Sequence, residues 1–138
     1  MGRRIFTTGV AIVASMALLL PMTVAGAHDF TVRPRISIDK IPNGATDPGE
    51  RVIVHGDING KRLCRRDRVV TLFEVQSGSD RRIDTDRSDR EGEFRFVLHP
   101  DDDMTVYARI GKLVDRSYDH RHVCRKARSE RLSINVSG

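Results

Sequence analysis

Apolar and polar residues alternate along most of the chain beyond residue 34, with the period of two that is typical of half-buried β-strands. The segment EFRFVL at residues 93–98 is the clearest example. The pattern predicts seven short strands, at residues 35–39, 52–58, 69–75, 81–86, 93–98, 104–110 and 132–136. Turn residues separate them, and no segment has a helical period long enough to cover a sheet. We therefore expect an all-β fold, a seven-stranded antiparallel sandwich of two sheets.

The strands differ in how apolar they are, which predicts their places in the sheets. Residues 69–75 are apolar on both faces, as in a central strand, whereas residues 81–86 are mostly polar, as in an edge strand. Residues 28–34 and 111–128 have no clear period, so we expect a mobile terminus and an irregular segment there. The predicted core is aliphatic and consists of Ile36, Ile38, Val52, Val54, Leu72, Phe94, Phe96, Val106, Ala108, Leu132 and Ile134.

The first 27 residues have the pattern of an export signal. Arg3 and Arg4 precede an apolar run at residues 10–20, and Ala-Gly-Ala at residues 25–27 has the form of a cleavage site. The run is too short to span a bilayer, and neither a second apolar run nor a lipid-carrying cysteine follows it. We therefore expect a secreted protein without a membrane anchor. The two arginines fit both the general secretory and the twin-arginine routes, and the apolar run favours the former.

Cleavage after Ala27 would leave one domain, residues 28–138, with His28 as its amino terminus. Loss of Arg3 and Arg4 lowers the net charge from +5 to +3. A nucleic-acid binder of this size usually concentrates positive charge on one face, whereas here arginine and aspartate alternate, so we expect no nucleic-acid partner. Arginine supplies 20 of the 24 basic residues, and its planar guanidinium suits carboxylates and phosphates.

Cys64 and Cys124 are the only cysteines of the chain. In an exported protein two cysteines are expected to be oxidised. They fall in the loop after the second expected strand and in the segment before the last one, which lie at the same end of a Greek-key sandwich. We therefore predict a Cys64–Cys124 disulfide, worth about 4 kcal/mol of stability through its effect on the unfolded chain.

The segment SDREGEF at residues 88–94 has the spacing of a tight turn that leads into a strand. We expect Asp89 to cap the turn and Gly92 to take the positive φ that ends it. Phe94 is then the first inward residue of the new strand.

This segment resembles the Thr/Ser-Asp-x-x-Gly-x-Phe signature of prealbumin-like and carboxypeptidase-regulatory-like sandwich domains. Residues 52–58 and 70–72 are similar to the second and third strands of that family, so the resemblance covers roughly residues 50–110. It implies an immunoglobulin-like or prealbumin-like sandwich that serves as an accessory, adhesive or carrier domain, and it implies no catalytic residues. The cysteine pair and the long segment before the last strand depart from the family pattern.

Histidines raise the question of a metal site. His120, His122 and Cys124 stand at alternate positions, and cleavage would expose His28 as the terminal residue. An amino-terminal histidine can chelate copper through its amine and a ring nitrogen, as secreted copper carriers of β-sandwich form do. Such carriers also need a partner histidine in a recognisable setting, which the sequence does not show, and a bridged Cys124 is unable to bind metal as a thiolate. We therefore expect neither a metal nor another cofactor.

No Gly-x-Ser-x-Gly elbow is present, and no histidine is tied by spacing to a serine or aspartate, so we expect no enzyme. Acidic turns at residues 84–91 and 101–103 lack the regular spacing of a calcium loop. The sequence favours a secreted, non-catalytic binding or structural module whose arginine-rich, disulfide-tethered end meets an extracellular protein or an acidic polymer. The alternative is an exported copper-binding protein that uses His28. The oligomeric state is left open.

Overall fold

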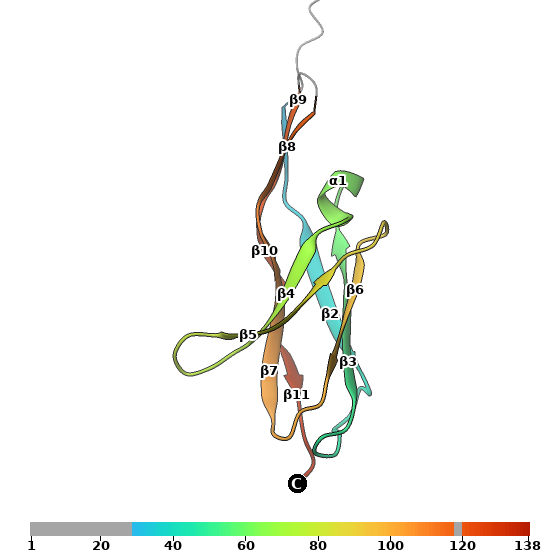
Figure 1. Ribbon diagram of the computed structural model, residues 1–138, viewed down its shortest axis with the longest axis vertical. Helices are drawn as coiled ribbons and strands as arrows, with labels where there is room; N and C mark the ends of the chain where they lie inside the picture. Colours follow the sequence, from blue (N-terminus) through green and yellow to red (C-terminus); the bar gives the residue numbers. More distant parts are fainter. Residues whose placement is uncertain (1–28, 118–119) are drawn as a thin grey trace, which may run out of the picture.

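The computed structural model of the protein describes residues 29–117 and 120–138. Over these residues the chain is all-β, with eleven strands and one helix of four residues, α1 (Arg62–Arg65). The molecule is elongated, and the C-terminus lies at one end of its long axis (Figure 1). The expected export signal, residues 1–27, and the expected mature terminus, His28, lie outside the described residues.

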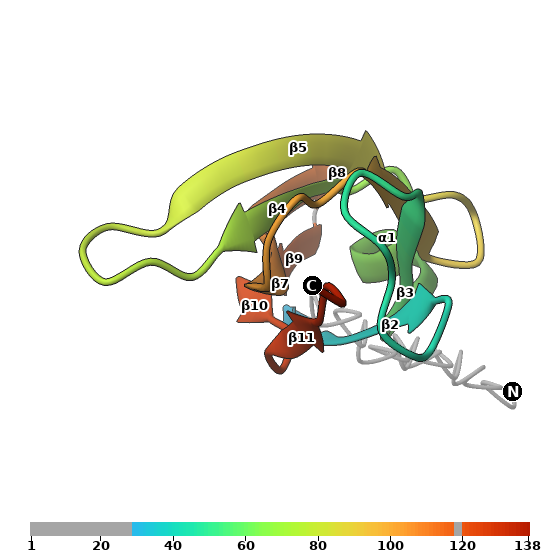
Figure 2. The same ribbon diagram turned by 90° about the horizontal axis from the view of Figure 1, so that it is seen from below.

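Two antiparallel sheets face each other across the core (Figures 1 and 2). The first has the order β2-β3-β6 and consists of β2 (Arg35–Ile41), β3 (Val52–Asn59) and β6 (Glu93–Leu98). The second has the order β10-β7-β4-β5, with β11 also paired to β7, and consists of β4 (Val69–Glu74), β5 (Arg81–Arg87), β7 (Met104–Ile110), β10 (Ala127–Arg128) and β11 (Leu132–Ile134). The predicted all-β class and antiparallel pairing are confirmed.

Both sheets turn alternate residues into the core, as the sequence pattern predicts. In β6, Phe94, Phe96 and Leu98 are buried while the residues between them are exposed. Nine of the eleven predicted core residues are buried in one cluster, and the other two, Ile38 and Leu132, are partly buried against it. The cluster also contains four residues outside the predicted core list: Ile58, Val70, Leu98 and Ile110.

The places of β4 and β5 agree with their sequences. β4 lies between β5 and β7, and in the described chain β5 pairs with β4 alone, as an edge strand. The two faces of β4 differ, however, because Val70 and Leu72 enter the core while Val69 is 50% exposed and Phe73 is half-buried. The outer apolar residues of β4 are therefore not core residues.

The predicted count of seven strands is not confirmed, because the described ranges contain eleven. Three additional strands form a third sheet in the order β1-β9-β8, and they are β1 (Phe30–Val32), β8 (Leu113–Ser117) and β9 (His120–Cys124). β1 pairs with β9 in parallel, and β8 pairs with β9 antiparallel. These three strands, called the arm from here on, project from one end of the facing sheets (Figure 1).

The arm and β10 occupy the two segments for which a mobile terminus and an irregular stretch were expected, residues 28–34 and 111–128. None of the arm residues belongs to the main core cluster. Because the arm does not contribute to that core, its strands need no alternation of apolar and polar residues, which is the signal on which the prediction depended.

The turn between β5 and β6 has the geometry that its sequence predicts. Asp89 Oδ1 accepts hydrogen bonds from the backbone N–H groups of residues 91, 92 and 93 at 2.8 to 2.9 Å. Gly92 has a φ of 97°, and Phe94 is 4% exposed. The predicted roles of Asp89 as the cap, of Gly92 as the residue with a positive φ and of Phe94 as the first inward residue are therefore confirmed.

The predicted disulfide joins Cys64 of α1 to Cys124 at the end of β9, with the two Cα atoms 5.4 Å apart. A disulfide is typical of a non-reducing compartment. Among the residues that the structure describes, no helix is long and apolar enough to cross a membrane.

Candidate functional site

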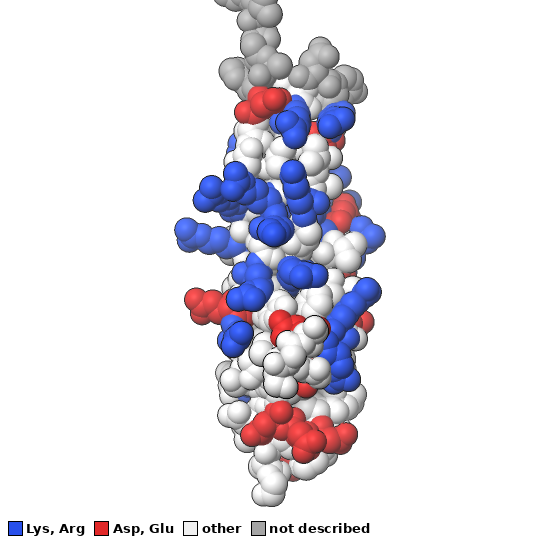
Figure 3. All heavy atoms as spheres, turned by 90° about the vertical axis from the view of Figure 1, so that its left-hand side faces the viewer, with Lys and Arg blue, Asp and Glu red and all other residues white. Residues whose placement is uncertain are grey.

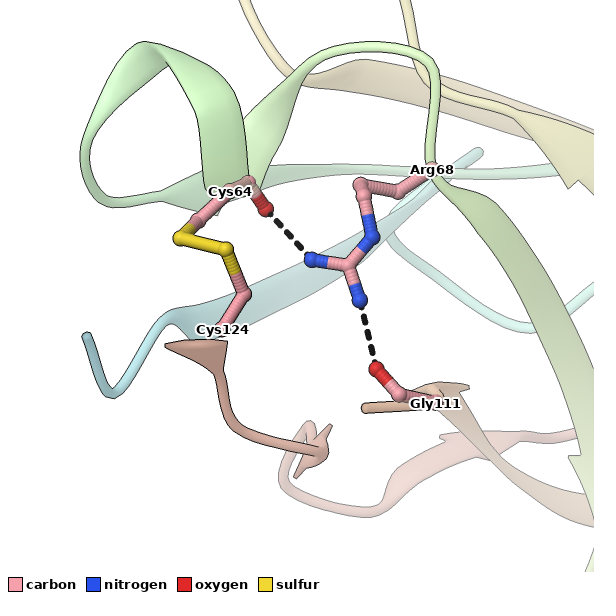
Figure 4. The surroundings of a disulfide bond; sticks show 4 residues. All are labelled: Cys64, Arg68, Gly111 and Cys124. Atoms are coloured by element: carbon pink, nitrogen blue, oxygen red, sulfur yellow. Dashed lines mark hydrogen bonds between the residues drawn. A yellow bond between two sulfur atoms is a disulfide. The ribbon is translucent and has the colours of Figure 1, made fainter. Parts of the chain in front are cut away.

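The base of the arm is fixed at two points (Figure 4). At the first, the disulfide links the end of β9 to α1, and both cysteines are fully buried. At the second, the guanidinium of Arg68 donates one hydrogen bond to the carbonyl of Cys64 at 2.8 Å and another to the carbonyl of Gly111 at 2.5 Å. Gly111 precedes β8, so both strands of the β8–β9 hairpin are held where they leave the second sheet.

Arg68 is 5% exposed, and burial lowers the pKa of its guanidinium below its usual value. An arginine with a lowered pKa still carries its charge at neutral pH. Its buried charge is therefore solvated by two backbone carbonyls instead of water, which makes Arg68 a structural residue of the arm base rather than a ligand-binding one.

A shallow groove of about 760 Å³ runs along the arm and its base. Its lining residues are Thr31, Arg33, Lys112, Arg121, Val123, Arg125 and Lys126. Five of the seven are cations, and no Asp or Glu belongs to the lining. The site with these seven residues is called the basic groove below.

Strand geometry explains why the groove is basic on one face. Arg121, Val123 and Arg125 are spaced two residues apart along β9 and its extension, so their side chains point to the same side. β1 lies beside β9 with Thr31 opposite Val123, which brings Arg33 to the same side. The carboxylate of Asp29 accepts a hydrogen bond from the backbone N–H of Arg121 at 3.0 Å.

The five groove cations are exposed. Figure 3 shows that Lys and Arg side chains gather over the upper and middle parts of one side of the molecule, whereas Asp and Glu gather near its lower end. A net charge of +5 for the whole chain therefore hides a strong local separation of charge. A surface with one sign of charge attracts ligands of the opposite sign.

The outer face of the first sheet carries a second groove with an acidic lining, whose carboxylates are Asp39, Asp57, Asp86, Asp89 and Glu93. Several of them already have partners inside the fold. Asp57 accepts hydrogen bonds from Ser37 and Asn59. Asp86 accepts one from the backbone N–H of Arg95 at 2.8 Å, which fastens the edge strand β5 to β6. These acids have structural tasks, so the basic groove is the stronger candidate for ligand binding.

The histidines of the arm lie close together. The rings of His120 and His122 are stacked with their centroids 6.2 Å apart, and Phe30 stacks on His122 at 4.0 Å. Cys124 is oxidised, so it is unable to serve as a thiolate ligand. Within residues 29–117 and 120–138, no group of three or more His, Cys, Asp and Glu side chains is placed to hold a metal ion. His28, the residue on which the copper alternative depends, lies outside the described residues.

Sequence reasoning missed the basic groove. Its cations come from three separate stretches, residues 31–33, 112 and 121–126, which meet because β9 pairs with both β1 and β8. The alternation of Arg121, Val123 and Arg125 was the one local signal, but it falls in a segment without any other strand pattern.

The chain matches no protein-family model and no curated protein. The resemblance to prealbumin-like domains therefore rests on the sequence alone, at residues 52–58, 70–72 and 88–94.

Proposed function

We propose that the protein is a secreted, non-catalytic module that binds an acidic polymer in the basic groove. The observation that supports this proposal is the composition of the groove lining, with five cations and no carboxylate. The four cations other than Lys112 belong to β1, β9 or the residues that directly follow them, and the disulfide and Arg68 hold this part of the chain in place. A rigid array of cations binds an anion at a lower entropic cost than a mobile one.

We also propose an immunoglobulin-like sandwich, of the prealbumin-like kind, as the fold that carries the arm. The order β2-β3-β6 in one sheet and β10-β7-β4-β5 in the other supports it, since in such a sandwich consecutive strands are shared between two antiparallel sheets. The turn at residues 88–94 supports the prealbumin-like assignment. The three strands of the arm are additions to this plan.

Secretion is supported by the signal pattern of the first 27 residues and by the disulfide. Amino-terminal sequencing of the exported protein should find His28 as the first residue. A terminus at Met1 would refute the export proposal.

A polymer fits the groove better than a single small anion because its cations are spread along a strand. Arg121 and Arg125 are four residues apart, which corresponds to about 13 Å at the usual rise of a β-strand. Side chains that extend to the same side of a strand from these two positions present two separate sites for anionic groups. Two anionic groups of one chain can occupy them together, so each contact strengthens the other.

The test is binding of sodium alginate, a polymer of uronates, compared with neutral dextran at low ionic strength. The variant Arg121→Gln/Arg125→Gln should bind alginate about tenfold more weakly, because two exposed charge pairs contribute about 0.5 to 1 kcal/mol each. Arg51→Gln/Arg90→Gln, with the same change of charge outside the groove, is the matched control and should bind like the wild type. Equal loss in both variants, or no preference for alginate over dextran, would refute the proposal.

Copper binding is the second candidate function, and one observation favours it. The sequence lacked a recognisable partner for His28, but β1 lies beside β9 so that Phe30, two residues after His28, stacks on His122. Two imidazoles of the arm, His120 and His122, are thus close to the point where the described chain begins. With the terminal amine and the ring of His28 they would make a nitrogen donor set that suits Cu(II).

Titration of the mature protein with Cu(II) distinguishes the two candidates. Nanomolar affinity that is lost in both His28→Ala and His122→Gln would establish the copper site. Affinity that persists in His122→Gln but is lost in His28→Ala would show that the terminal residue binds copper without the arm. The absence of nanomolar affinity in the wild type would refute the second candidate.

A further inference from the structure

Two stacked aromatic rings, each with an arginine over it, lie on the outer face of the second sheet. Phe73 of β4 and Tyr107 of β7 are paired across the two strands, and their rings stack with centroids 5.4 Å apart. The guanidinium of Arg109 lies 4.4 Å from the centroid of Phe73, and that of Arg128 lies 4.9 Å from the centroid of Tyr107. These four residues are called the arginine ladder below.

The rings hold the two guanidinium groups in place. A cation over an aromatic face is attracted by the ring quadrupole, and a guanidinium on a ring keeps the N–H donors at its edge free for hydrogen bonding. Arg109 and Arg128 are exposed in the described structure. Because stacking restricts these side chains before a ligand arrives, less rotamer freedom is lost when an anion binds.

The ladder presents guanidinium groups rather than open aromatic rings. Phe73 is half-buried beneath Arg109, and Tyr107 is 5% exposed, with its hydroxyl donating a hydrogen bond to Asp80 at 2.9 Å. Proteins that bind single-stranded nucleic acids usually stack bases on open rings, which this face does not provide. The ladder fits an anionic chain without bases.

Asp80 is the acid that touches the ladder, and it lies within the electrostatic influence of Arg128. Its carboxylate already accepts hydrogen bonds from Tyr107 and from the backbone N–H of Gln76. Asp80 is thus bonded within the fold, and neither of these hydrogen bonds comes from a guanidinium of the ladder.

The ladder continues the basic groove. Arg128 is paired with Arg109 in the register of β10 and β7. Lys126 lies two residues before Arg128, and Lys112 lies three residues after Arg109, so each groove lysine is within about 10 Å along the chain of a ladder arginine. Figure 3 shows Lys and Arg side chains following one another down this side of the molecule.

We propose that the arginine ladder is a second anion subsite, so that one chain of an acidic polysaccharide, with carboxylates as its charged groups, runs from the basic groove onto the outer face of the second sheet. This inference rests on the proposed function, because it assumes that the groove binds the same chain. It adds that the polymer is a polysaccharide and that the binding affinity depends on chain length. A short oligomer fills only the basic groove, whereas a longer one also reaches the arginine ladder.

Alginate oligomers fractionated by length test the inference. Wild-type affinity should increase with length until both sites are filled. Arg109→Gln/Arg128→Gln should bind the shortest binding oligomers like the wild type and should lose about tenfold in affinity for long ones. Arg109→Lys/Arg128→Lys keeps the charge without the planar fork and should recover only part of that loss. Arg51→Gln/Arg90→Gln is again the charge-matched control, and thermal unfolding midpoints verify that every variant is folded.

Equal affinity of wild type and Arg109→Gln/Arg128→Gln for long oligomers would overturn the ladder subsite. The proposal that the basic groove binds the polymer would remain valid. An absence of binding at every length would refute the proposed function and the ladder with it. Nucleic acids are the other class of anionic polymer, and single-stranded DNA of equal charge is the probe for them. If it displaces long alginate with equal or higher affinity, the assignment to a polysaccharide is wrong.

Discussion

Gly92 shows how one residue decides the path of the chain. It ends the turn between β5 and β6 with a φ of 97°, and a Cβ atom there would lie 2.6 Å from the carbonyl oxygen of Ile58. Backbone atoms of a buried strand are unable to move away as a flexible side chain would. Both the conformation and the close approach therefore require glycine.

Gly92→Ala should lower the free energy of unfolding by about 2 kcal/mol or more, because strain in a left-handed conformation adds to a steric overlap. Gly78→Ala is the matched control, since a Cβ atom on Gly78 would meet no atom within 4 Å and Gly78 has no positive φ. Denaturant unfolding measures both. Equal stability of the two variants would show that the turn adapts to a side chain.

Tyr107 and Asp80 alter each other's protonation. The hydrogen bond from Tyr107 is the main cause that lowers the pKa of Asp80 below 3.8, and the bond from the backbone N–H of Gln76 adds to it. Burial is the main cause that raises the pKa of Tyr107 above 10.0, and Asp80 adds to it. The folded state therefore favours ionised Asp80 and neutral Tyr107.

These shifts predict the pH dependence of stability. The contribution of Asp80 is present above about pH 4 and is lost as the pH falls through its lowered pKa, because the unfolded chain then binds the proton more readily. The contribution of Tyr107 is present below pH 10 and is lost as the pH rises further. In Tyr107→Phe, denaturant midpoints should vary less with pH at both limits than in the wild type. Parallel profiles for the two proteins would contradict the assignment.

How well a residue could be predicted depends on how local its partners are. Asp89 was correctly assigned as a cap because the N–H groups that it binds are two to four residues away. Arg68 was not singled out, because its acceptors, Cys64 and Gly111, are four and 43 residues away and meet only in the folded arm base. The sequence contains no local sign of such a contact.

Among the strands, those of the facing sheets could be predicted from the sequence, whereas those of the arm could not. The strands of the facing sheets bury alternate residues, so most of them were predicted within a residue or two. The arm strands make no part of the main core and depend instead on backbone pairing and on the disulfide. A small sheet of three strands that lies outside the main core buries little apolar surface, so the arm should depend strongly on its attachment.

Cys64→Ser/Cys124→Ser should therefore release the arm before the rest of the fold opens. With the cysteines 60 positions apart in the sequence, the chain-entropy model gives a loss of about 4 kcal/mol. Amide hydrogen exchange should accelerate most in β8 and β9 and least in β3 and β7, which lie between other strands. Uniform acceleration, or an unchanged unfolding midpoint, would show that the arm does not need the disulfide.

At the scale of the whole molecule, the distribution of charge matters more than its sum. The net charge led to the expectation of a mixed surface, yet five cations converge on one groove and two more continue it on the second sheet. This convergence depends on the parallel pairing of β1 with β9, between residues about 90 positions apart, which no sequence pattern revealed. The disulfide end was correctly expected to be rich in arginine, but the groove itself emerges only from the fold.

The most direct test of the central claim is to follow the backbone amide NMR signals during titration of the mature protein with alginate. Shifts should appear first at Thr31, Arg33, Lys112 and residues 121–126, and they should fade as added salt screens the charges. With long chains they should extend to Arg109 and Arg128. Shifts that are absent, or that centre on the acidic turn at residues 101–103 rather than on the basic groove, would contradict the central claim.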